Sequence, residues 1–162
     1  MTKHIMIPTD LSVRSLNLVR YAVNHFEGQP IKITLLHFME LPGSITDLLM
    51  IPRDGAHLRL ITPEFREGIS LLRNSYGSQI EGIGIDFLQG ATRRMLKNYL
   101  ENRKIDAILF PENYELKMPS KRSIDPSGMI RRCGWPVLSV KISRHQVPVQ
   151  EESIAQLLLA TA

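Results

Sequence analysis

The chain has 162 residues, of which 43% are apolar, and this length and composition are typical of one globular domain and exclude general disorder. The formal net charge is +4, no run approaches the roughly 18 uninterrupted apolar residues of a membrane span, and no charged segment leads into an apolar signal core, so we expect a cytoplasmic protein without a membrane partner. The single cysteine, Cys133, excludes an internal disulfide, and the five histidines show no ligand spacing, so we expect no metal site.

The first third of the chain alternates between strand and helix. Residues 3–7 predict a short apolar strand, and Ser12 is a candidate N-cap for a helix that Gly28 ends. One face of that helix carries the apolar residues Leu16, Val19, Val23 and Phe26. Residues 31–38 are almost continuously apolar, as expected of a strand that is covered on both faces. This pattern favours a parallel sheet.

Two segments interrupt the alternation. Residues 39–61 contain Pro42, Gly43, Pro52 and Gly55 and are too long for an ordinary connection, so they predict an insertion or lid between the second strand and the second helix. Its apolar residues Ile45, Leu48, Leu49 and Ile51 are interpreted as packing residues. At the other end, we expect one domain over residues 1–142 and a tail over 143–162 that docks on it or crosses to a second subunit.

The rest of the chain continues the alternation of strands and helices. Helices are predicted over 63–76, 90–103 and 127–133, and strands over 83–88, 106–110 and 135–140. Five strands and four helices then alternate. Right-handed crossovers and one reversal of strand order predict an α/β fold, a doubly wound parallel sheet in the order 3-2-1-4-5 with helices on both faces.

Three side chains are candidates for chemistry, and each has a structural alternative. Asp10 follows the first strand, where open α/β sheets bind ligands, but a short carboxylate there also commonly bonds the amides of its own turn. His37 is either a catalytic base or a hydrogen-bonded core histidine, and the second interpretation is preferred because no nucleophile is positioned with it. Cys133 is either a thiol of lowered pKa beside Arg132 or a small hydrophobic residue.

Basic residues become more frequent toward the C-terminal third of the chain: Lys117, Lys121, Arg122, Arg131, Arg132, Lys141 and Arg144. Such a bias either favours anionic partners or forms a solvated face. No aromatic residues interleave with these charges, so a stacking platform for nucleic acid is not indicated.

Four stretches together carry a resemblance to the universal stress protein family: residues 5–12 with Ala22 in the following helix, and residues 33–38, 104–109 and 135–140. The resemblance spans almost the whole chain. It implies the five-stranded fold shared with the adenine nucleotide alpha hydrolases and a homodimer. It also implies that Asp10 matches a residue that contacts adenosine in those members of the family that bind ATP.

The resemblance fails at the phosphate loop. ATP-binding members carry GxxGx9G followed by Ser or Thr after the fourth strand, whereas here Pro111 and Tyr114 replace the first two glycines and Ser123 or Ile124 the third. Proline has no N–H to donate to a phosphate, and Glu112 and Glu115 add negative charge. We therefore expect no ATP site of the family type, and ATP is the one cofactor left open.

The expected function is that of a non-catalytic stress-response regulatory protein that acts as a homodimer, with protein partners left open. The dimer interface would be an edge strand formed by Val137, Leu138, Ser139 and Val140. The alternative is a nucleotide-binding switch or slow ATPase in which the basic loop 117–123 replaces the glycine loop. A retained nucleotide site would comprise Pro8, Thr9, Asp10, Phe38, Asn113, Lys121, Arg122 and Ser123. A nucleotidyl-transfer enzyme is a weaker third candidate, because no catalytic signature is present.

Overall fold

The computed structural model describes residues 1–40, 56–90, 92–112 and 115–141. Most of the expected insertion, the tail after residue 142 and Asn113 lie outside the described residues. The strands are β1 Lys3–Pro8, β2 Ile31–Met39, β3 Ile80–Gln89, β4 Ala107–Pro111 and β5 Val137–Val140. The α-helices are α1 Asn17–His25, α3 Pro63–Ser75, α4 Arg93–Asn102 and α5 Ser127–Arg132, and two 3-10 helices are η1 Val13–Leu16 and η2 Ala56–Leu60.

All five strands are parallel and lie in the order β3-β2-β1-β4-β5, which confirms the predicted topology. The central strand β1 pairs with β2 on one side and with β4 on the other, so the strand order reverses beside it. A doubly wound sheet has its ligand crevice at such a reversal, outside the carboxyl ends of the strands. The turn after β1 therefore lies where such sheets bind ligands.

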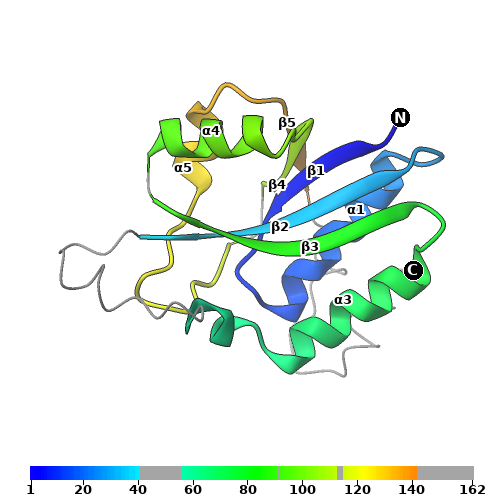
Figure 1. The fold of residues 1–162 in the computed structure, drawn as a ribbon, viewed down its shortest axis with the longest axis horizontal. Helices are drawn as coiled ribbons and strands as arrows, with labels where there is room; N and C mark the ends of the chain where they lie inside the picture. The colour runs from blue at the N-terminus through cyan, green and yellow to red at the C-terminus, as the bar shows by residue number, and fades with distance from the viewer. Residues whose placement is uncertain (41–55, 91, 113–114, 142–162) are drawn as a thin grey trace.

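Helices cover both faces of the sheet. Figure 1 shows α1 and α3 on one face and α4 and α5 on the other. Successive residues of β1 accordingly enter different cores, because side chains alternate across a strand: Ile5 and Ile7 pack toward α1 and α3, and Met6 packs toward α4 and α5. This double burial explains why the strands are continuously apolar in sequence.

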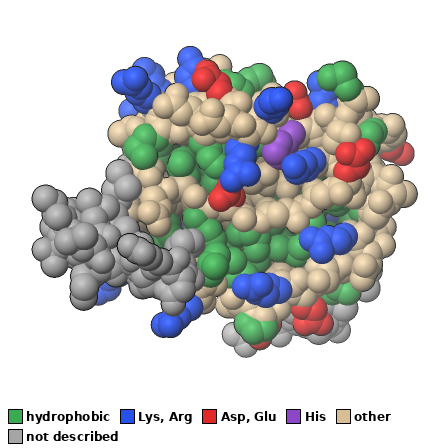
Figure 2. Space-filling view, in the orientation of Figure 1, with side chains coloured by type: hydrophobic (Ala, Val, Ile, Leu, Met, Phe, Trp, Pro, Cys, Tyr) green, Lys and Arg blue, Asp and Glu red, His purple; other side chains and the backbone are tan. Residues whose placement is uncertain are grey.

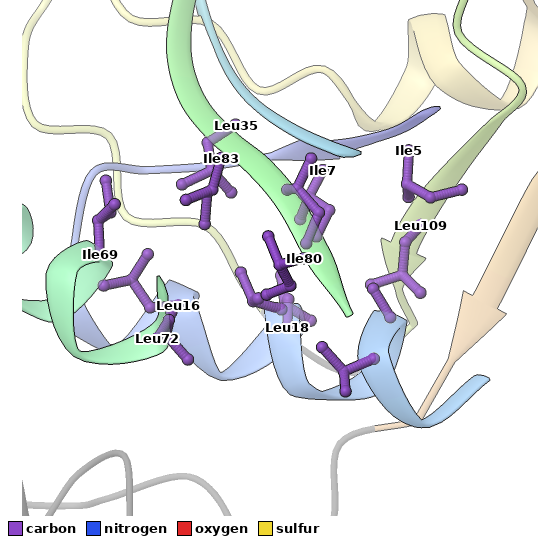
Figure 3. Packing of buried hydrophobic residues seen from close by; sticks show 14 of the residues in the cluster. Ile5, Ile7, Leu16, Leu18, Leu35, Ile69, Leu72, Ile80, Ile83 and Leu109 are labelled. Atoms are coloured by element: carbon purple, nitrogen blue, oxygen red, sulfur yellow. The ribbon is translucent and has the colours of Figure 1, made fainter. Parts of the chain in front are cut away.

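The larger core lies between the sheet, α1 and α3. Figure 3 shows Leu16 and Leu18 meeting strand residues from below, with Ile69 and Leu72 of α3 beside them. Each of these four side chains is buried. The smaller core, on the other face, contains Phe38, Leu96, Leu100, Ile108 and Ile130.

Element boundaries differ from the sequence predictions at a few places. Strand β3 begins at Ile80, earlier than the predicted residue 83, because Gly82 and Gly84 interrupt the apolar pattern while their backbones still pair with β2. The helix predicted after Ser12 begins as the 3-10 turn η1 before α1 follows. Helix α4 begins at Arg93 and not at Gly90, since Thr92 is its N-cap and accepts a hydrogen bond from Met95 N.

Candidate functional site

The turn after β1 is held by Thr9, which is 3% exposed. Its backbone N–H donates to Leu36 O at 3.0 Å, and its Oγ1 accepts from Leu11 N at 3.0 Å and lies 2.9 Å from Ser15 Oγ. These bonds hold Leu11 in the left-handed region, with a φ of 62°. The carboxylate of Asp10 is thereby fixed beyond the carboxyl end of β1.

Asp10 is 2% exposed and accepts hydrogen bonds on both carboxylate oxygens. Its Oδ1 accepts from Ser12 N at 3.0 Å and from Ser12 Oγ at 2.5 Å, which confirms the turn-bonding interpretation. Its Oδ2 accepts from Lys117 N at 2.9 Å, a contact between residues 107 positions apart. The segment after β4 thus returns over the crevice and donates a backbone N–H to the carboxylate.

His37 links the same turn to the same segment. It is 1% exposed, and its Nδ1 lies 2.8 Å from Thr9 O while its Nε2 lies 2.8 Å from Ser123 Oγ. Because a carbonyl only accepts, Nδ1 carries the proton and the neutral Nε2 accepts from the serine hydroxyl. Burial lowers the pKa of His37, and the bond to Thr9 O and the charge of Asp10 partly oppose this shift. The structure confirms a hydrogen-bonded core histidine.

Backbone hydrogen bonds hold this segment, residues 115–124, against the carboxyl end of β2. Ile124 N donates to Phe38 O at 2.9 Å, and Glu40 N donates to Arg122 O at 2.7 Å. Met39 and Ser123 form an antiparallel bridge. Figure 1 shows the segment in yellow, passing the carboxyl ends of β1 and β2. We call it the crevice loop.

The structure brings together only part of the predicted nucleotide set. Pro8, Thr9 and Asp10 are buried at the end of β1, and Ser123 reaches them through His37. Phe38 is 1% exposed and belongs to the core under α4 and α5. The side chains of Lys121 and Arg122 are exposed, and within the described ranges no hydrogen bond joins either side chain to Asp10.

The crevice differs at two places from the nucleotide site that the family resemblance implies. Pro111 ends β4 and has no N–H for a phosphate. Asp10 already receives a backbone N–H from the crevice loop, so a ligand hydroxyl that binds its Oδ2 would share this oxygen with Lys117 N. Among the residues that the structure describes, no cluster of three His, Cys, Asp or Glu side chains could hold a metal ion, and no helix is long and apolar enough to cross a membrane.

The predicted interface strand lies at an edge of the sheet. β5 pairs with β4, and no other described strand lies beyond it. Val137, Leu138 and Val140 are half-buried, and Ser139 is exposed. The edge position is confirmed.

The other predicted candidate, Cys133, is a buried packing residue. It is 5% exposed, and its Sγ donates to Ile130 O at 3.1 Å. Its neighbours in the smaller core are apolar, so the structure confirms the interpretation as a small hydrophobic residue.

Comparison with known proteins supports the fold. No protein-family model and no curated sequence matches the chain. A structure of the hypothetical protein PH0823 has a TM-score of 0.55 at 15% identity, covering 87% of this chain and 96% of that one. A universal stress protein in complex with cAMP gives 0.53 at 18% identity, with 87% and 98% covered, and hypothetical protein MJ0577 gives 0.50 at 14%, with 88% and 97% covered. The chain therefore has the fold of the universal stress proteins.

Proposed function

We propose that the chain is a non-catalytic regulatory protein of the universal stress protein type, which acts as a homodimer and does not bind ATP in the crevice after β1. The contact between Lys117 N and Asp10 Oδ2, at 2.9 Å, carries the proposal. The protein's own backbone N–H thereby bonds the carboxylate that a ribose hydroxyl would contact in a nucleotide complex. The bond between His37 and Ser123 holds the crevice loop in the same position.

Adenosine is the probe that tests the crevice, because it lacks phosphates and so does not report on basic side chains elsewhere. We expect calorimetric titration of the folded protein at physiological salt to give no saturable heat up to millimolar adenosine. Thermal melting of the same sample shows that it is folded. Micromolar binding that Asp10→Asn weakens would overturn the proposal and favour the nucleotide-binding switch. A universal stress protein with this fold has been solved in complex with cAMP, which supports that alternative.

The proposed dimer forms through the side of β5 along which no described strand pairs. The carbonyls of Pro136 and Val140 accept from Ile108 N and Glu112 N, so the alternating groups of Val137 and Ser139 point away from β4. An edge strand with outward N–H and C=O groups is a template for pairing with another chain. A second copy that pairs along β5 would bury the half-exposed side chains Leu138 and Val140.

Ser139 offers a matched pair of variants for the dimer. Ser139→Pro removes one outward N–H while leaving the bonds to β4, and a proline is tolerated on the free side of an edge strand. Ser139→Ala keeps that N–H. We expect sedimentation equilibrium to show dimers for the parent and Ser139→Ala and monomers for Ser139→Pro. A monomeric parent, or a dimer that Ser139→Pro leaves intact, would contradict pairing through this strand.

A further inference from the structure

A pocket of about 260 Å³ lies between α4 and α5, away from the crevice loop. Arg93, Arg94 and Lys97 of α4 line it from one side, and Arg132 and Cys133 at the end of α5 line it from the other. Four of these five residues are cations. We propose that this pocket binds a small anion that carries two linked phosphate groups.

The positive charge in the pocket has no ion-pair partner among the described residues. Within the described part of the chain, the ion pair is Arg103 with Asp86, and none of the four pocket cations has a carboxylate partner. Arg93 donates from its guanidinium to the backbone oxygen of Arg132 at 3.2 Å, so a hydrogen bond joins α4 to the end of α5 at the pocket. Like charges held close repel, and this repulsion is removed when an anion binds among them.

The direction of α4 adds to this field. Arg93 and Arg94 occupy its first turn, where no acidic residue is present. The N-terminal end of a helix is the positive end of its dipole, and acidic side chains are the ones that normally stabilise it. Here the dipole and the side chains have the same sign, and both favour an anion at this end of the helix.

The shape and chemistry of the pocket narrow the class of ligand. Arginine side chains bind phosphate oxygens through two parallel N–H bonds, and three of the four cations are arginines. Cys133 is only 5% exposed, so the side chains that face a ligand are mainly the four cations. A volume of about 260 Å³ suits a compact anion better than a polymer, and four cations can neutralise all the negative charges of a diphosphate group. The proposal does not depend on the crevice, since the pocket shares no residue with it.

Pyrophosphate is the probe for this pocket, measured by calorimetry at physiological ionic strength. We expect saturable binding to the parent protein, weakened at least about tenfold by Arg94→Gln with Lys97→Gln, since charge-assisted contacts carry the affinity. The control, Arg66→Gln with Lys32→Gln, removes the same charge from exposed positions outside the pocket and should leave the affinity unchanged. Arg66 lines a separate groove between α3 and β3, where Figure 2 shows an apolar band flanked by basic side chains.

Three results would overturn the proposal. They are no binding of pyrophosphate at millimolar concentration, equal weakening by the pocket and control variants, and binding of a single-stranded oligonucleotide without binding of pyrophosphate. If the double variant does not fold, Lys97→Gln alone removes one exposed cation and should weaken binding about threefold. A crevice that binds adenosine would refute the proposed function and leave this pocket unaffected, so the two failures are distinguishable.

Discussion

His37 ties the stability of the fold to pH. Its pKa is lowered in the folded protein, mainly by burial, so between that value and the ordinary pKa of about 6.5 the unfolded chain binds more protons than the folded one. The free energy of unfolding is therefore highest above pH 6.5 and falls as the pH drops below it. We expect urea denaturation midpoints to fall from pH 7.5 to pH 5.5.

The variant His37→Asn separates this effect from other titrating groups. Its side-chain amide can still donate to Thr9 O, but it does not titrate. We expect a flatter dependence of the denaturation midpoint on pH in this variant. The remaining slope would contain the contribution of His4, whose pKa burial also lowers. An unchanged slope would show that His37 does not carry the effect.

Lys117 contributes to stability through its backbone and not through its side chain. The side chain is exposed, whereas its N–H donates to the buried carboxylate of Asp10. Lys117→Pro removes the donor, and we expect it to lower the free energy of unfolding by about 1–3 kcal/mol, the usual cost of a lost bond to a charged group. Lys117→Ala keeps the N–H and should stay within about 0.5 kcal/mol of the parent, as exposed substitutions usually do.

Urea denaturation of both Lys117 variants measures this difference. Equal stability of the proline and alanine variants would mean that the closure of the crevice over Asp10 is not an energetic feature of the fold. It would also remove the main support for the proposed function.

At these positions the sequence predicts local contacts better than distant ones. The carboxylate of Asp10 bonding Ser12 follows from the spacing of two residues in one turn. The bond from Lys117 N depends on how the segment after β4 returns, and a backbone N–H has no side-chain signature in sequence. The pocket cations Arg93, Arg94 and Lys97 are visible as a basic run, but only the fold places Arg132 beside them.

Among the elements, the helices with clear capping signals were the most predictable. Pro63 in the first turn correctly predicts the start of α3. Strand β3 was predicted too short because its glycines contribute no side chain to the core, while the pairing that defines the strand involves only their backbones. Periodicity in sequence detects buried side chains, not hydrogen bonds.

The N-cap of α3 gives a prediction at this scale. Thr62 is exposed and accepts a hydrogen bond from Phe65 N at 3.1 Å, which satisfies one of the free amides at the start of the helix. Thr62→Ala should lower the free energy of unfolding by about 1 kcal/mol, whereas Thr62→Ser should keep most of it. Thermal unfolding followed by circular dichroism measures both, and equal losses in the two variants would show that the cap does not stabilise α3.

For the molecule as a whole, topology was more predictable than the site because it depends on many weak signals that agree. Continuous apolar strands required helices on both faces, and right-handed crossovers left few arrangements. The two cores, one on each face of the sheet, contain the side chains that produce these signals. The crevice, in contrast, depends on a few hydrogen bonds made by the irregular crevice loop, and no repeating pattern in the sequence predicts these bonds.

The charge of the whole molecule leads to the final prediction. The net charge is +4, and the arginine of the ion pair among the described residues is exposed. Added salt should therefore screen repulsion between charges more than it weakens their attraction.

A ligand at ten times its Kd adds about 1.4 kcal/mol to stability, which corresponds to roughly 3–6 °C in Tm for a domain of this size. We therefore expect pyrophosphate to raise the Tm by such an amount above sodium chloride at matched ionic strength. The variant with Arg94→Gln and Lys97→Gln should lose this difference while still responding to sodium chloride, because only the pocket distinguishes the two anions. If the variant and the parent respond equally to pyrophosphate, the stabilisation is a general salt effect and not binding between α4 and α5.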